Sequence, residues 1–158
     1  MKYGHFSEQG LEFIITEPIT PRPWINYLTN EDYCAIISQC AGGYSFYKDC
    51  RSGRILRWAP ENWHFDRPGR YIYIIDKDEG NFWSPTFQPV RGKPQSYQCR
   101  HGLGYTVIES IYYGVKAEIT YFVPVSDPCE VWLVKISNLS GKKKNLQLFP
   151  YIEWLIGR

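Results

Sequence analysis

Turn-forming residues interrupt this sequence so often that a long regular helix has no room. The 158 residues include 13 Gly and 11 Pro, and no segment keeps its apolar residues at the roughly 3.6-residue spacing of a capped amphipathic helix. The runs between the turns are short and rich in β-branched and aromatic residues, which pack well on a pleated strand. The sequence therefore predicts an all-β fold, an antiparallel β-sandwich, in one domain that spans residues 1–158.

The clearest local pattern predicts a hairpin of residues 105–112 and 115–123, closed around Tyr113-Gly114. In its second arm apolar residues alternate with polar ones, as expected for a strand with one face in the core and one toward water. The residues predicted to face the core are Val115, Ala117, Ile119 and Tyr121.

Other strands are predicted where apolar runs lie between turn signals. A short helix starting at the potential cap Asn30 competes with the strand that follows it, and the strand is preferred. Residues 17–23 hold three prolines and are predicted to form an extended segment. The large side chains of residues 24–28, which follow it, are predicted to anchor this segment to the core. The predicted strands are residues 1–6, 11–16, 33–38, 54–58, 70–76, 81–84 and 95–101, followed by a last hairpin of residues 130–137 and 146–154.

Two further turns are predicted, one from a pair of glycines and one from a run of lysines. Gly102 and Gly104 flank Leu103 and predict a bulge or corner. Residues 142–144 are three lysines, interpreted as the solvated tip of the last hairpin. The other basic residues are dispersed and the net charge is only +2, so we expect no nucleic-acid partner.

The stretch Ala41-Gly42-Gly43-Tyr44-Ser45-Phe46-Tyr47 is organised around two glycines, which let another backbone or a ligand approach closely. As a strand it would place Tyr44 and Phe46 on one face and the hydroxyls of Ser45 and Tyr47 on the other. One interpretation is a bend between two strands of the sandwich. The other is a surface on which Tyr44, Ser45 and Tyr47 contact a sugar or a partner subunit.

Arg100-His101-Gly102 places a cation and an imidazole beside a glycine corner. The pair Arg100 and His101 could bind an anion or a sugar hydroxyl, or could satisfy buried carbonyl groups at a strand end. No nucleophile elbow, phosphate-binding loop, dinucleotide motif or paired carboxylates point to catalysis. His64 lies in a predicted loop, residues 59–69, and is not a catalytic candidate. We therefore assign no catalytic residue.

Five cysteines occur with no C-x-x-C spacing, which argues against a disulfide framework and against a zinc site. Free, buried thiols in a reducing compartment are the expected state. The N-terminus lacks the apolar segment of a signal peptide, and no apolar run approaches the length of a membrane span. We expect a cytoplasmic protein with no metal, no cofactor and no membrane partner.

A set of short motifs runs in order along nearly the whole chain: Lys2–Phe6, Phe13–Thr16, Pro23–Leu28, Ala41–Tyr47, Arg54–Arg57, Trp83–Pro85, Arg100–Tyr105, Tyr121–Pro124 and Glu130–Trp132. Together these motifs resemble the cellobiose and chitobiose phosphorylases, glycoside hydrolase family 94. A further stretch, Phe65-Asp66-Arg67-Pro68-Gly69-Arg70-Tyr71, is similar to the chitobiose branch.

The resemblance implies a cytoplasmic, homodimeric enzyme that cleaves a β-linked disaccharide with inorganic phosphate as co-substrate and inverts the anomeric centre. The general-acid aspartate and the phosphate site of such enzymes lie in a later α/α-barrel domain, which is absent here. The resemblance also implies that the first domain, a large β-sandwich, packs on the partner subunit and shapes the entrance to its active site. The chain departs from the family pattern at Leu155–Arg158. We therefore expect a truncated, inactive sandwich domain.

Two other functions stay open on the sequence alone. The chain could be a freestanding carbohydrate-binding module that uses exposed Trp and Tyr side chains, or a structural sandwich with no ligand. A module would bind sugar by itself, whereas the domain of a phosphorylase would bind sugar weakly or not at all and would self-associate through its unfinished edge.

Overall fold

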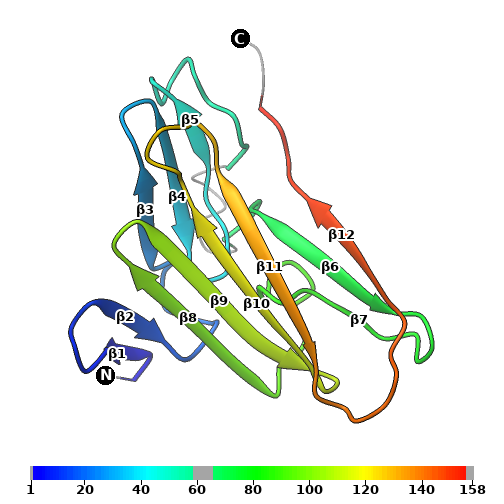
Figure 1. The fold of residues 1–158 in the computed structure, drawn as a ribbon. Helices are drawn as coiled ribbons and strands as arrows, with labels where there is room; N and C mark the ends of the chain where they lie inside the picture. The colour runs from blue at the N-terminus through cyan, green and yellow to red at the C-terminus, as the bar shows by residue number, and fades with distance from the viewer. Residues whose placement is uncertain (1, 59–65, 156–158) are drawn as a thin grey trace.

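A computed structural model describes residues 2–58 and 66–155 (Figure 1). Within these ranges every regular element is a strand, and all strand pairs are antiparallel. The prediction of an all-β, antiparallel sandwich is thus confirmed. The strands are β1 (Gly4–Phe6), β2 (Glu12–Ile15), β3 (Ile25–Thr29), β4 (Tyr33–Ser38), β5 (Ser45–Tyr47), β6 (Tyr71–Asp76), β7 (Phe82–Trp83), β8 (Ser96–Gly102), β9 (Tyr105–Tyr112), β10 (Val115–Phe122), β11 (Val131–Asn138) and β12 (Leu146–Tyr151).

The strands form one large sheet and two small ones. The six-stranded sheet has the order β1-β2-β8-β9-β10-β11, and the three-stranded sheets have the orders β12-β6-β7 and β3-β4-β5. Figure 1 shows the two small sheets lying behind the large one. The core fills the space between them, because its buried side chains come from both layers, among them Leu28 of β3, Ile74 of β6 and Ile108 of β9.

The hairpin predicted at residues 105–123 is present as β9 and β10, with Val115 paired to Tyr112. Tyr113 and Gly114 both have positive φ, 50° and 72°, as a tight two-residue hairpin turn requires. The four residues predicted to face the core are fully buried: Val115, Ala117, Ile119 and Tyr121.

The prediction that residues 130–137 and 146–154 pair with each other is wrong. β11 pairs with β10 in the large sheet, whereas β12 pairs with β6 in a small one. The connecting residues cross from one layer to the other, and the crossing is fixed by Lys144. Its ammonium lies 2.7 Å from the buried carboxylate of Asp76 and 3.2 Å from Glu79. Lys144 is therefore not a solvated lysine as predicted, since its side chain is only 6% exposed.

Two strand predictions near the glycine stretch also need correction. Residues 54–58 form no strand, only isolated bridges from Arg54 to Phe46 and from Leu56 to Trp154. Residues 24–28 were predicted to anchor the chain to the core but not to form a strand, and residues 25–29 form β3. Within that segment Leu28 is buried, but Tyr27 is 57% exposed because alternate residues face outward.

Asn30 does not start a helix, because it closes the turn between β3 and β4. Its Oδ1 accepts the backbone N–H groups of Asp32 and Tyr33, and its Nδ2 donates to the carbonyls of Pro124 and Asp127. Of the predicted bulge or corner at residues 102–104, the structure shows the corner, a two-residue hairpin turn. Gly102 pairs with Tyr105 across it.

No helix in residues 2–58 and 66–155 has the length and apolar character to cross a membrane.

Candidate functional site

The glycine stretch packs around a buried carboxylate. Asp66 is 6% exposed, and its Oδ2 accepts a hydrogen bond from Ser38 Oγ. The same Ser38 oxygen accepts the backbone N–H of Cys40 at 3.1 Å and of Gly42 at 2.9 Å. Burial raises the pKa of Asp66 to about 6, although Ser38 and Arg70 favour the charged form.

A glycine is required at position 42 because Asp66 occupies the space that a Cβ would need. A Cβ built at Gly42 would come within 2.0 Å of Asp66 Oδ1, a distance no side chain can accept. Gly43 has φ +112°, and a Cβ there would meet the carbonyl oxygen of Ile36 at 2.1 Å. Both glycines thus have a structural role in joining β4 to β5.

The three candidate contact residues of this stretch do not form one surface. The side chain of Ser45 is fully buried and so faces no external molecule. The Tyr44 ring stacks on Trp58 at 6.1 Å, and the Arg54 guanidinium lies 4.5 Å from its centroid. Tyr47 is 40% exposed. Contact of Tyr44 or Tyr47 with a sugar or partner stays a prediction.

Arg100 and His101 serve separate contacts. The guanidinium of Arg100 lies 3.8 Å from Glu12 and 3.9 Å from Glu118. His101 Nε2 donates to the carbonyl of Trp24 at 3.0 Å, and Nδ1 accepts from the Thr106 hydroxyl at 2.9 Å. Burial lowers the pKa of His101 to about 4, so the imidazole is neutral. His101 thereby satisfies a carbonyl at a strand junction, one of the two interpretations drawn from the sequence.

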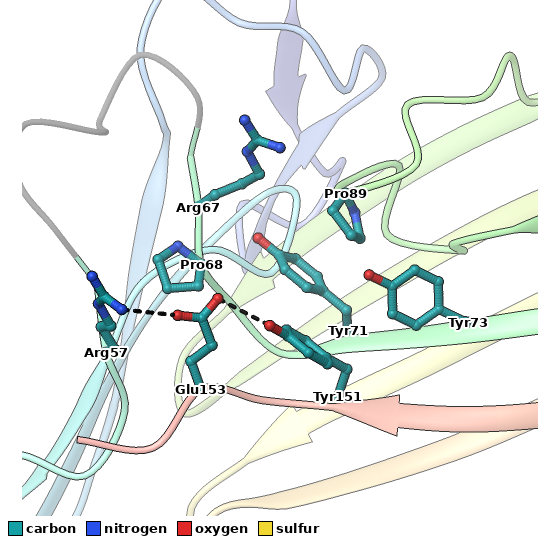
Figure 2. Close-up of a pocket in the computed structure, with 8 residues that line it drawn as sticks. All are labelled: Arg57, Arg67, Pro68, Tyr71, Tyr73, Pro89, Tyr151 and Glu153. Carbon is teal, nitrogen blue, oxygen red and sulfur yellow. Dashed lines mark hydrogen bonds and ion pairs between the residues drawn. The ribbon is translucent and has the colours of Figure 1, made fainter. Parts of the chain in front are cut away.

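A cleft that the sequence did not predict lies over the pair β6 and β12 (Figure 2). Its volume is about 500 Å³. Tyr71 and Tyr151 face each other in the sheet register, with parallel rings 6.4 Å apart, and the Tyr73 ring stands edge-on to Tyr151. The lining residues are Arg57, Arg67, Pro68, Tyr71, Tyr73, Pro89, Tyr151 and Glu153.

Glu153 joins the polar groups of the cleft. Its Oε1 accepts the Tyr151 hydroxyl at 3.0 Å, and its Oε2 lies 3.6 Å from Arg57 Nη1. The hydrogen bond to Glu153 raises the pKa of Tyr151, because the nearby carboxylate disfavours the phenolate. The backbone N–H of Arg57 also donates to the carbonyl of Glu153 at 2.9 Å. The carboxylate is therefore held in place from two sides.

The cleft is lined by aromatic rings, prolines, two arginines and one carboxylate, Glu153. In the described ranges no group of three metal-ligating side chains is found. The five cysteines are unpaired, and Cys40 and Cys99 are buried. His64 lies outside the described residues.

Comparison with known proteins extends these observations. The glycosyl hydrolase 94 supersandwich domain matches residues 11–158. N,N′-diacetylchitobiose phosphorylase of Vibrio proteolyticus is 42% identical over 156 residues, covering 98% of this chain and 19% of that protein. The same enzyme of Vibrio furnissii gives equal values. A 3-O-β-D-glucopyranosyl-β-D-glucuronide phosphorylase of Paenibacillus borealis is 38% identical over 147 residues, 93% of this chain and 18% of that protein.

The chain spans about a fifth of the length of these relatives. Their names specify different disaccharides, yet all are phosphorylases that share this segment. The resemblance found in the sequence motifs is thus confirmed, and the sandwich described above agrees with the matched domain. On this evidence the chain belongs to the glycosyl hydrolase 94 family, as part of its supersandwich domain.

Proposed function

We propose that this chain is the N-terminal part of the sandwich domain of an inverting glycoside phosphorylase, an enzyme that converts a β-linked disaccharide and inorganic phosphate into a sugar 1-phosphate and a free sugar. The observation that carries the proposal is the 42% identity to a chitobiose phosphorylase across 98% of the chain. The catalytic acid and the phosphate site would lie in the rest of the longer protein.

The role proposed for this domain is dimer assembly and shaping of the active-site entrance. Exposed apolar side chains on the outer strands support it, since large side chains left in water mark surfaces that another layer covers. Leu133 of β11 is 62% exposed, and Trp154, which follows β12, is 60% exposed. We propose that the rest of the sandwich or the second subunit of a homodimer covers them. The free thiols fit a cytoplasmic location.

The test compares the chain with the longer protein. Sequencing the DNA beyond the codon for Arg158 should show an open frame that encodes a helical domain. The longer protein should release a sugar 1-phosphate from diacetylchitobiose or cellobiose with inorganic phosphate, and the 158-residue chain should release none. A stop codon directly after Arg158 would overturn the proposal and favour a freestanding carbohydrate-binding module. Phosphorolysis by the chain alone would also overturn it.

A further inference from the structure

We propose that the cleft over β6 and β12 is a binding site for one neutral pyranose ring. Its size is suitable, because about 500 Å³ lies within the range of small-molecule pockets, roughly 300–1,000 Å³. The proposal depends on the lining residues alone and not on phosphorolysis.

The first argument is the aromatic wall. A pyranose with equatorial hydroxyls has two flat C–H faces, and such a face packs against the face of an aromatic ring. Tyr151 is 40% exposed and is held by its parallel contact with the buried Tyr71. Tyr73 stands at 81° to Tyr151 and makes a second side. Because both rings are fixed by strands, little side-chain entropy is lost on binding.

The second argument is the set of hydrogen-bonding groups beside that wall. Figure 2 shows the hydroxyls of Tyr73 and Tyr151 pointing toward the side of the cleft where Glu153 and Pro68 lie, whereas the buried Tyr71 hydroxyl donates to the Asp66 carbonyl at 3.2 Å. A carboxylate offers about four acceptor positions, and Tyr151 and Arg57 use only part of those on Glu153. Two neighbouring sugar hydroxyls can donate to the rest. Arg57, whose side chain is 62% exposed, can donate to the sugar oxygens.

The same groups disfavour other ligands. A metal ion would require more oxygen or nitrogen ligands than the one carboxylate provides. An anion would be attracted by Arg57 and Arg67 but repelled by Glu153, whose carboxylate lies 3.6 Å from Arg57 Nη1. A neutral, polyhydroxylated ring can use the carboxylate and the Arg57 guanidinium together and stack on the tyrosine. The carboxylate therefore favours a sugar over an anion, and a titration with phosphate tests this.

The experiment is an NMR titration of the 158-residue chain with glucose, N-acetylglucosamine and cellobiose, each to about 50 mM, without phosphate. We expect amide shifts confined to residues 67–73 and 149–153 and a dissociation constant on the order of 1 mM, as is usual for one ring in an open cleft. A titration with inorganic phosphate alone forms a separate arm. Shifts at these residues with phosphate and none with sugar would overturn the proposal, as would no shift with any of them.

Three variants locate the site. Glu153→Gln keeps the shape of the side chain but removes its charge, and should weaken sugar binding about tenfold. Tyr151→Ala should abolish binding. Tyr27→Ala is the control, because Tyr27 is 57% exposed but lies outside the cleft, and it should bind as the native chain does. If Glu153→Gln and Tyr27→Ala behave alike, the proposal fails, even where Tyr151→Ala alters folding.

Discussion

At the scale of single residues, two buried titratable groups give the chain opposite responses to acid. The pKa of His101 is lowered to about 4 from 6.5, and the pKa of Asp66 is raised to about 6 from 3.8. Below pH 6.5 the unfolded chain protonates its histidine while folded His101 stays neutral, so acid destabilises the fold. Below pH 6 folded Asp66 takes up a proton that the unfolded chain does not bind, so acid stabilises the fold.

Replacing His101 should remove the loss of stability that this residue causes on acidification. In His101→Gln the amide can still donate to the Trp24 carbonyl and accept from Thr106, but it has no charge to gain. Native His101 contributes about 3 kcal/mol at neutral pH that is lost as the pH falls from about 6.5 to about 4. Relative to the native chain, the variant should become more stable with acid over this range. Urea unfolding at a series of pH values measures the difference, and parallel curves would contradict the assigned pKa.

Replacing Asp66 should have the reverse effect. Asp66→Asn abolishes the proton uptake that stabilises the native fold by about 3 kcal/mol between about pH 6 and pH 4. The variant should therefore lose stability on acidification more steeply than the native chain. The double variant with His101→Gln lacks both titrating groups. Because their effects on stability are opposite and similar in size, its stability should change with pH about as much as that of the native chain. A double variant that keeps either slope would show that another group titrates in this range.

Gly42 tests the close packing of Asp66 by steric means. Gly42→Ala would place a methyl group 2.0 Å from Asp66 Oδ1, and we expect a loss of about 2–3 kcal/mol in the free energy of unfolding. Gly92→Ala is the control, because its added Cβ would be 3.4 Å from the Tyr112 ring and meet nothing closer. Thermal or urea unfolding of both variants gives the comparison. Equal losses would remove the steric explanation.

At the scale of elements, β12 joins its sheet through the ion pairs of Lys144 with Asp76 and Glu79 as well as through backbone hydrogen bonds. Lys144→Met would leave the carboxylate of Asp76 without its partner at the start of the β6–β12 pairing. We expect faster hydrogen exchange of the β12 amides, while exchange in β9 and β10 stays as it was. Lys142→Met changes an exposed lysine two residues away and serves as the control. Equal exchange in the two variants would show that Lys144 does not hold β12.

Hairpins with short loops were predictable because the residues that specify their pairing lie close together in the sequence. Apolar alternation and a glycine able to adopt positive φ specify β9 and β10 within twenty residues of sequence. The pairing of β12 with β6 was not predictable from alternation, because an edge strand with apolar residues fits several partners. The cleft was missed for the same reason. Tyr73 and Tyr151 are ordinary strand residues until that pairing brings them together.

At the scale of the whole molecule, the all-β fold and the family followed from turn spacing and motif order, whereas the roles of Ser45 and His101 followed only from burial. A strand pattern does not say which face meets the second layer. Ser45 was predicted on a hydroxyl-bearing face and lies in the core, and His101 was an open candidate that the structure pairs with a backbone carbonyl.

The exposed apolar side chains of β11 and β12 should make the isolated chain self-associate. Leu133 and Leu148 are 62% and 41% exposed on these two outer strands. Replacing both with lysine should shift the sedimentation of concentrated samples toward monomer. Leu103→Lys is the control, because Leu103 is 91% exposed but lies in the turn between β8 and β9. A native chain that sediments as a monomer at all concentrations would contradict the prediction.

The crossing that brings β12 to β6 also has a consequence for biosynthesis. Lys144 emerges from the ribosome 68 residues after Asp76, the carboxylate that it neutralises. At translation rates of about 5–20 residues per second, one edge of β6 waits roughly 3–14 seconds for its partner strand. During that interval the Asp76 carboxylate lacks the lysine that neutralises it, and the neighbouring edge of β6 is unpaired. Slow codons between the two would lengthen this wait, and a chaperone that shields strand edges would have its main substrate there.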